Sequence, residues 1–276
     1  MAAIGATATL LRESLGMTIG GSSITASFPP QQPGLMYLTE GGTETEIMYK
    51  YGFELPEFAM FPLLDQPAAV AELRGVYTRY LDTAARHGFG VVIGGLDYRA
   101  SPDWADLLGY SPKALRDMQL RAIGFLREVS EPYQADLPAL MYAGIVGPRG
   151  GAYSLNQTIT AEEAEDYHST QITTLALAEV DLVEAMTFNS VAESVGVARA
   201  AARAGLPVPI LFTLDSNHLL HSGPSLKESS NRSMPRRVRT GPPSIASTAR
   251  TPSSSSPRSN PATGFSGCDA YDRTPP

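Results

Sequence analysis

The sequence contains a single cysteine, Cys268, and this scarcity excludes two kinds of structure. One thiol can form no disulfide framework within the chain, and it cannot supply a metal centre built from several cysteine ligands. No apolar run approaches the ~18 residues of a membrane-spanning helix, and no basic segment followed by a sustained apolar stretch marks a secretory signal. We therefore expect a protein of the cytoplasm with no membrane partner.

Lysine is absent from the last part of the chain, and strongly apolar residues are rare there. Residues 229–276 carry a net charge of +5 against −7 for the whole chain, so the preceding residues carry −12. Such a composition cannot bury enough apolar surface to form a core, which predicts a disordered Ser/Pro/Arg-rich tail in which no strand or amphipathic helix can be drawn. A basic arm for nucleic acid is another interpretation, but the arginines are scattered, so no nucleic-acid partner is expected.

The first 34 residues are small and polar, and Gly, Ser and Pro accumulate towards residue 34. This composition predicts a disordered N-terminal extension over residues 1–34. The body of the protein is then expected over residues 35–228, and the aberrant tail over residues 229–276.

The body alternates between short apolar runs and helical patterns. Val70, Leu73, Val76 and Tyr80 recur at spacings of three and four residues, which is typical of a helix with one apolar face. Strands separated by single helices imply right-handed βαβ units and a parallel sheet. The predicted strands are residues 35–38, 90–94, 139–145, 180–186 and 208–212, and the predicted helices are residues 67–87, 112–129, 161–178 and 190–204.

The segment YLTEGGTETE, residues 37–46, is the one around which the rest of the body is organised. A short apolar run ends there in Glu40, followed by Gly41 and Gly42, which let the backbone turn sharply and approach a ligand. In a (β/α)8 barrel, chemistry lies at the carboxyl ends of the strands. The alternative is an ordinary turn whose acids are solvated and cap a helix, and this applies most directly to Glu44 and Glu46.

Five segments together resemble the homocysteine S-methyltransferase family, and they occur in the family's order. They are EGGTETE after the first strand, DYRASPDW at residues 97–104, AGIVGPRGGAY at residues 143–153, DLVEAMTFNSVAE at residues 181–193 and PILFTLDSNHLLHSGPSL at residues 209–226. The resemblance implies an α/β fold, a (β/α)8 TIM barrel. It also implies methyl transfer from a donor to a small-molecule thiol such as homocysteine, with zinc held by three cysteine thiolates. This chain would supply about five βα units, an incomplete barrel.

Two positions depart from the family pattern. Glu40 stands where the family usually has Asp, and Met186 stands where the methyltransferases proper carry Glu at the end of the fourth strand. A thioether cannot bind an ammonium group as a carboxylate does, so the thiol substrate could differ from homocysteine. The zinc-ligand cysteines are missing, so no metal ligand is predicted and no zinc is expected to bind. The predicted substrate-binding residues are Glu40, Gly41, Gly42, Thr43, Asp97, Tyr98, Gly147 and Met186.

Other residues that could carry chemistry have simpler interpretations. His218 and His221 form an HxxH pattern without a third ligand nearby, which favours a solvated loop over a metal pair. His168 is expected to pack its ring within a helix, and Trp104 is expected in the core or at the rim of a site.

The family pattern stops near residue 227, and a reading-frame slip is our hypothesis for the change. Residues 229–252 can be back-translated and read two bases later as a string that contains F-Y-C-I-N-C, which resembles the family's sixth strand with its first zinc ligand. We therefore expect a methyltransferase-like chain that is truncated and inactive. The alternative is a non-enzymatic barrel remnant or binding fragment.

Overall fold

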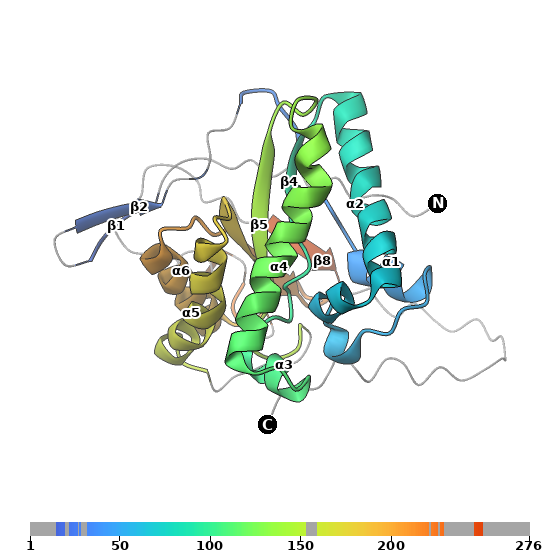
Figure 1. Cartoon of the computed structure of the whole chain (residues 1–276). Coiled ribbons are helices and arrows are strands. Elements are labelled where there is room, and N and C mark those ends of the chain that lie inside the picture. The colour runs from blue at the N-terminus through green and yellow to red at the C-terminus, as the bar shows by residue number, and fades with distance from the viewer. Residues whose placement is uncertain are drawn as a thin grey trace, which may run out of the picture.

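The computed structural model describes residues 15–19, 22–26, 28, 32–152, 159–220, 222–225, 227–228 and 246–250. Strands and helices alternate along most of this part of the chain (Figure 1). The strands are β1 (Leu15–Ile19), β2 (Ser22–Ala26), β3 (Tyr37–Thr39), β4 (Gly90–Ile93), β5 (Leu140–Val146), β6 (Leu182–Phe188), β7 (Ile210–Leu214) and β8 (Ala246–Arg250). The helices are α1 (Thr43–Tyr49), η1 (Pro56–Phe58), η2 (Phe61–Asp65), α2 (Pro67–His87), α3 (Pro102–Leu107), α4 (Pro112–Ser130), η3 (Glu131–Tyr133), α5 (Ala161–Leu177) and α6 (Val191–Ala204).

The main sheet has the strand order β3-β4-β5-β6-β7-β8, and each strand is parallel to the next. Strands that pair only with their neighbours in sequence, with helices between them, build the wall of a (β/α)8 barrel. Strands β3 and β8 end the sheet, and no pairing among the described residues joins them. The prediction of an incomplete barrel with about five βα units is confirmed.

The five predicted strands correspond to β3 to β7, and the four predicted helices to α2, α4, α5 and α6. Thr160 caps α5 reciprocally with Glu163: the Thr160 hydroxyl accepts from the Glu163 N–H at 3.2 Å, and the Glu163 carboxylate accepts from the Thr160 N–H at 2.8 Å. Gly205 closes α6 in the left-handed conformation, with φ of 73°. Local capping chemistry therefore sets these ends.

Three strands lie in segments for which the sequence predicts disorder. Strand β8 pairs with β7 inside the tail, so the expectation that no strand lies there is wrong for residues 246–250; the exposed edge of β7 offers unpaired backbone groups to an extended segment. Strands β1 and β2 form an antiparallel hairpin within the predicted extension. The other tail residues lie outside the described part of the chain.

The helices α2, α4, α5 and α6 cover one face of the sheet (Figure 1). Because side chains alternate along a strand, Val91 and Ile93 of β4 pack into the larger apolar cluster under the helices, while Val92 joins a smaller cluster on the inner face with Ala143 and Ile145. Across the described residues, no helix combines the length and apolar content that crossing a bilayer requires.

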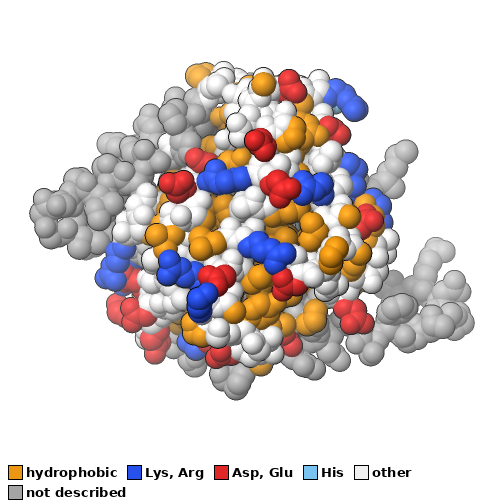
Figure 2. All heavy atoms as spheres, viewed as in Figure 1, with side chains coloured by type: hydrophobic (Ala, Val, Ile, Leu, Met, Phe, Trp, Pro, Cys, Tyr) orange, Lys and Arg blue, Asp and Glu red, His pale blue; other side chains and the backbone are white. Residues whose placement is uncertain are grey.

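Figure 2 shows Lys and Arg side chains interspersed with Asp and Glu on the helix-covered side of the molecule. Arg74 pairs with Glu128 at 2.7 Å, and Arg199 pairs with Glu162 at 3.1 Å. Exposed pairs of this kind contribute little to stability. The mixture of signs on this face is typical of solvated helices.

Gly196 brings helices α5 and α6 into close contact. A Cβ atom added at residue 196 would lie 2.6 Å from the backbone N of Glu165 and 2.7 Å from the carbonyl O of Ala161. Neither backbone atom can move without shifting α5. Gly196→Ala is therefore expected to lower the free energy of unfolding by about 1–3 kcal/mol, measured by urea denaturation.

Gly124 in α4 provides the matched control for this substitution, because a Cβ atom there would have no heavy atom within 4 Å. Gly124→Ala is expected to raise the free energy of unfolding by about 0.5–1 kcal/mol, since alanine favours the helix. A loss of stability of the same size in both variants would contradict the steric argument.

Candidate functional site

A pocket of about 220 Å³ lies at the carboxyl ends of strands β3 to β6. It is smaller than the ~300–1,000 Å³ clefts that hold drug-sized ligands, so its ligand would be small. Six predicted site residues line it together: Glu40, Gly41, Gly42, Thr43, Tyr98 and Met186. The other lining residues are Glu44, Phe58, Gly95, Arg99, Ile145, Ala152 and Thr187.

The turn after β3 brings Glu40 into the pocket and starts helix α1. Gly42 adopts the left-handed conformation, with φ of 62°, immediately before the helix begins at Thr43. The Tyr80 hydroxyl donates to the carbonyl O of Gly41 at 3.0 Å and fixes this turn against α2. The position of Glu40 therefore follows from the glycine turn and from an anchor on α2.

The Glu40 carboxyl has an unusually high pKa for a glutamate. Burial, and then the nearby Glu184 on β6, raise its pKa to about 8, although backbone hydrogen bonds at Glu40 and Gly94 lower it in part. Its Oε2 atom is buried and has no hydrogen-bond partner among the described residues. Burial also raises the pKa of Glu184 to about 7. At pH 7 the Glu40 carboxyl is thus mostly protonated and the Glu184 carboxyl about half protonated, and either would ionise further beside a cation.

A β-bulge at the end of β6 turns two consecutive side chains into the pocket. The pairing of β6 with β7 shifts between Ala185 and Phe188, and both Met186 and Thr187 line the cavity. Thr187 has φ of 60°, which is rare for a β-branched residue. Bulges and strained backbone concentrate at functional sites, which supports a binding role for this edge.

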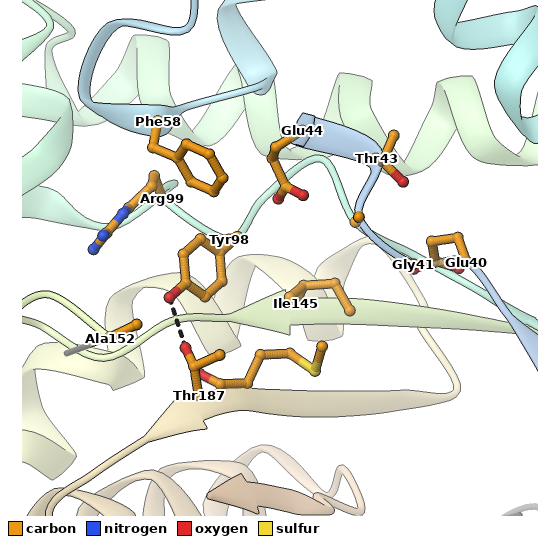
Figure 3. A pocket seen from close by; sticks show the side chains of 13 residues that line it. Glu40, Gly41, Thr43, Glu44, Phe58, Tyr98, Arg99, Ile145, Ala152 and Thr187 are labelled. Atoms are coloured by element: carbon orange, nitrogen blue, oxygen red, sulfur yellow. Dashed lines mark hydrogen bonds between the residues drawn. The ribbon is translucent and has the colours of Figure 1, made fainter. Parts of the chain in front are cut away.

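Tyr98 crosses the pocket floor and joins β4 to β6 (Figure 3). Its hydroxyl lies 2.6 Å from the Thr187 hydroxyl, which itself donates to the Met186 carbonyl at 2.7 Å. The Tyr98 hydroxyl must therefore be the donor to Thr187. This bond holds the bulge in place and fixes one wall of the pocket.

Two predicted site residues, Asp97 and Gly147, lie next to the pocket without lining it. The Asp97 carboxylate accepts from the Ile145 N–H at 3.0 Å, and burial raises its pKa to about 7. The Gly147 N–H donates to the Tyr98 carbonyl at 3.2 Å, and a Cβ atom there would lie 2.7 Å from the same oxygen. Both residues position neighbouring segments of the site.

Arg99 is the one charged side chain of the pocket that the sequence analysis does not mention as a candidate. Its side chain is buried, with 2% of its surface exposed, and its guanidinium stacks 4.1 Å from the Trp104 ring and 5.0 Å from the Tyr98 ring. Glu44 lines the same cavity, and burial raises its pKa even though Arg99 lowers it in part. The position of Arg99 directly after Asp97 and Tyr98 is the signal that could have identified it.

A buried pair of side chains supports the loop that follows β5. His168 Nε2 lies 3.0 Å from Glu193 Oε1, and both side chains are fully buried. The same Glu193 oxygen accepts from the Arg149 N–H at 2.6 Å. The ring of His168 also packs against Phe188, as the sequence predicts for a helical histidine. Glu193 thereby links helices α5 and α6 to the loop after β5, which contributes Ala152 to the pocket wall.

The residues present do not fit a zinc centre of the kind that the family resemblance implies. Among the described residues no group of three or more His, Cys, Asp or Glu side chains could hold a metal ion. The chain has one cysteine, so it cannot supply three thiolates, and Cys268 lies outside the described residues. His218 is exposed, and His221 lies outside the described residues.

Comparison with known proteins gives a family and a fold. A family model described as homocysteine S-methyltransferase matches residues 37–239. The crystal structure of the homocysteine methyltransferase MmuM from Escherichia coli in its metallated form is similar, with a TM-score of 0.60, 22% identity, and coverage of 72% of this chain and 69% of that chain. Its oxidized form gives a TM-score of 0.57 and 21% identity, with coverage of 71% and 68%. No curated protein sequence matches the chain.

Proposed function

Because the chain belongs to the homocysteine S-methyltransferase family, we propose that its pocket binds a small sulfur-containing amino acid through the ligand's ammonium group, and that the chain as it stands does not transfer a methyl group. The single observation that carries the binding proposal is Glu40. Its buried carboxyl has an oxygen without a hydrogen-bond partner among the described residues, and it lines a small pocket at the carboxyl ends of parallel strands.

The chain's own residues suffice for binding. A bound ammonium group would ionise Glu40 and satisfy its unpaired oxygen, which removes the cost of burying that group alone. Ile145 and Met186 would contact the apolar part of the ligand. In intact relatives, zinc would activate the thiol, but the described residues of this chain offer no set of ligands that fits zinc.

Calorimetric titration with L-methionine tests the binding proposal, because its thioether does not oxidise to a disulfide. We expect saturable binding to the purified chain and a loss of about 10- to 100-fold in affinity for Glu40→Gln, the size of one charge-assisted hydrogen bond. Glu46→Gln is the control, since Glu46 lies outside the pocket lining and pairs with Lys50 at 2.7 Å. Equal losses in both variants, or no binding, would refute the proposal.

The affinity for the amino acid is expected to depend on pH through Glu40. The pKa of about 8 means that the free carboxyl is protonated at pH 6 to 7, so binding an ammonium group must displace a proton. Affinity should rise about tenfold from pH 6 to pH 7 and level off above pH 8. Glu40→Gln should flatten most of this dependence, leaving only what Glu44 and Glu184 contribute. An equally steep profile in Glu40→Gln would assign the dependence to another group.

A further inference from the structure

Strand β7 would be an edge strand of the main sheet without the tail of the chain. Its residues, Ile210–Leu214, read ILFTL, so every one is apolar or β-branched, and none is charged or a proline. Such residues favour strands. An apolar edge strand with unpaired N–H and C=O groups is a template for pairing with another chain. The edge of β7 that faces away from β6 is therefore a surface that needs an occupant.

Strand β8, from the tail, occupies this edge. It pairs in parallel with β7, from Leu211 opposite Ala246 to Leu214 opposite Arg250. The sequence of β8, ASTAR, contains one β-branched residue and no large apolar residue. Because such a segment has a low preference for strands, the main-chain hydrogen bonds supply most of the interaction with β7. The edge of β7 therefore accepts an extended segment with little regard to its sequence.

Strand β8 is itself a poor template for a further strand. Its pairing with β7 shifts in register between Phe212 and Thr213, which leaves Thr248 as an extra residue on β8. A bulge of this kind bends a strand and interrupts the regular spacing of its backbone groups, and a charged residue such as Arg250 also opposes pairing at an edge. The tail thus replaces an apolar edge of the sheet by a bulged and polar one.

We infer that the outer edge of β7 is a strand-binding surface, and that residues 246–250 cap it within the same chain and prevent β7 from pairing with the β7 of a second copy. Two copies of one edge strand can pair about a two-fold axis, which buries the same edge in both copies. The inference is independent of the proposed function, because it concerns the end of the sheet and not the pocket. It gives the tail a role in keeping the chain monomeric.

Sedimentation velocity of the full chain tests the inference. The double variant Ser247→Pro/Ala249→Pro removes two backbone N–H groups from β8, and proline is excluded from paired positions inside a sheet. We expect the unsubstituted chain to sediment as a monomer of 29.4 kDa. The double variant should form dimers or larger species, with a dissociation constant for self-association at least about tenfold lower. Ser253→Pro/Ser255→Pro is the control, because it makes a similar change in the tail outside β8.

Leu211→Lys identifies the surface through which the double variant associates. Leu211 belongs to β7 but to neither of the two apolar clusters of the described residues, and lysine on an edge strand opposes pairing with another chain. Added to the double variant, Leu211→Lys should restore the monomer.

Four results would overturn the inference: a monomeric double variant, equal association of the control, association that Leu211→Lys does not reduce, or an unsubstituted chain that is already associated. Circular dichroism would show whether the double variant is folded. If it precipitates, its solubility with and without Leu211→Lys gives the same decision.

Discussion

The purified chain is expected to contain no stoichiometric zinc and to show no methyl transfer to L-homocysteine. A frame-restored version is expected to bind zinc and to transfer the methyl group. In that version, the residues from Ser229 onward are replaced by the product of the alternative reading frame. The physical reason is the lack of metal ligands: a chain with a single cysteine cannot hold zinc with three thiolates. Mass spectrometry would measure the metal content, and a sulfonium donor such as S-adenosylmethionine would supply the methyl group.

A control variant separates metal ligation from barrel closure. The frame-restored protein with its new cysteines replaced by serine can still complete the sheet, but it has no thiolates for zinc. It should fold cooperatively and remain inactive. Stoichiometric zinc or measurable turnover in the unrestored chain would refute the ligand argument, and an inactive, zinc-free restored protein would refute the frame-slip hypothesis.

Removal of the buried carboxylate in Glu193→Ala is expected to cause the largest loss of stability among single substitutions proposed for this chain. Glu193 Oε1 pairs with His168 Nε2 at 3.0 Å and accepts from the Arg149 N–H at 2.6 Å. The variant leaves both groups buried and unpaired, at a cost of about 1–3 kcal/mol for each, and it also leaves a cavity. Thermal denaturation followed by circular dichroism would measure the change.

Glu162 provides the comparison for this substitution. It lies in the first turn of α5 and pairs with Arg199 at the surface. Glu162→Ala should change the melting temperature little, since exposed ion pairs contribute little. Glu193→Gln keeps one acceptor oxygen and should fall between the two alanine variants. Similar melting temperatures for Glu162→Ala and Glu193→Ala would show that the buried pair is not what holds the loop after β5.

The sequence predicts the elements whose signals are local. The apolar stripe of α2 and the cap at Thr160 depend on neighbouring residues, and the structure matches both. The glycines that follow the first strand predict a turn at Glu40 at the carboxyl end of a barrel strand. The pocket lies at this turn. That Glu40 binds a substrate stays a prediction.

The features that the sequence could not predict depend on contacts between distant segments. Glu184 appears in the sequence as one acid in an apolar strand, and its proximity to Glu40 follows only from the curvature of the sheet. The bulge at Met186 and Thr187 arises where the register of β6 against β7 shifts. Strand β8 forms from a polar segment because β7 offers an edge, which composition does not reveal.

The order of the main sheet has a consequence for how the protein is made. Each strand from β4 to β8 pairs with the strand that precedes it in sequence, so each βα unit can dock onto the one before it as the chain leaves the ribosome. The walls of the pocket come from residues 40–187 and are complete before the tail is synthesised. A change of reading frame beyond residue 227 would therefore alter the chain only after every residue that lines the pocket had been synthesised.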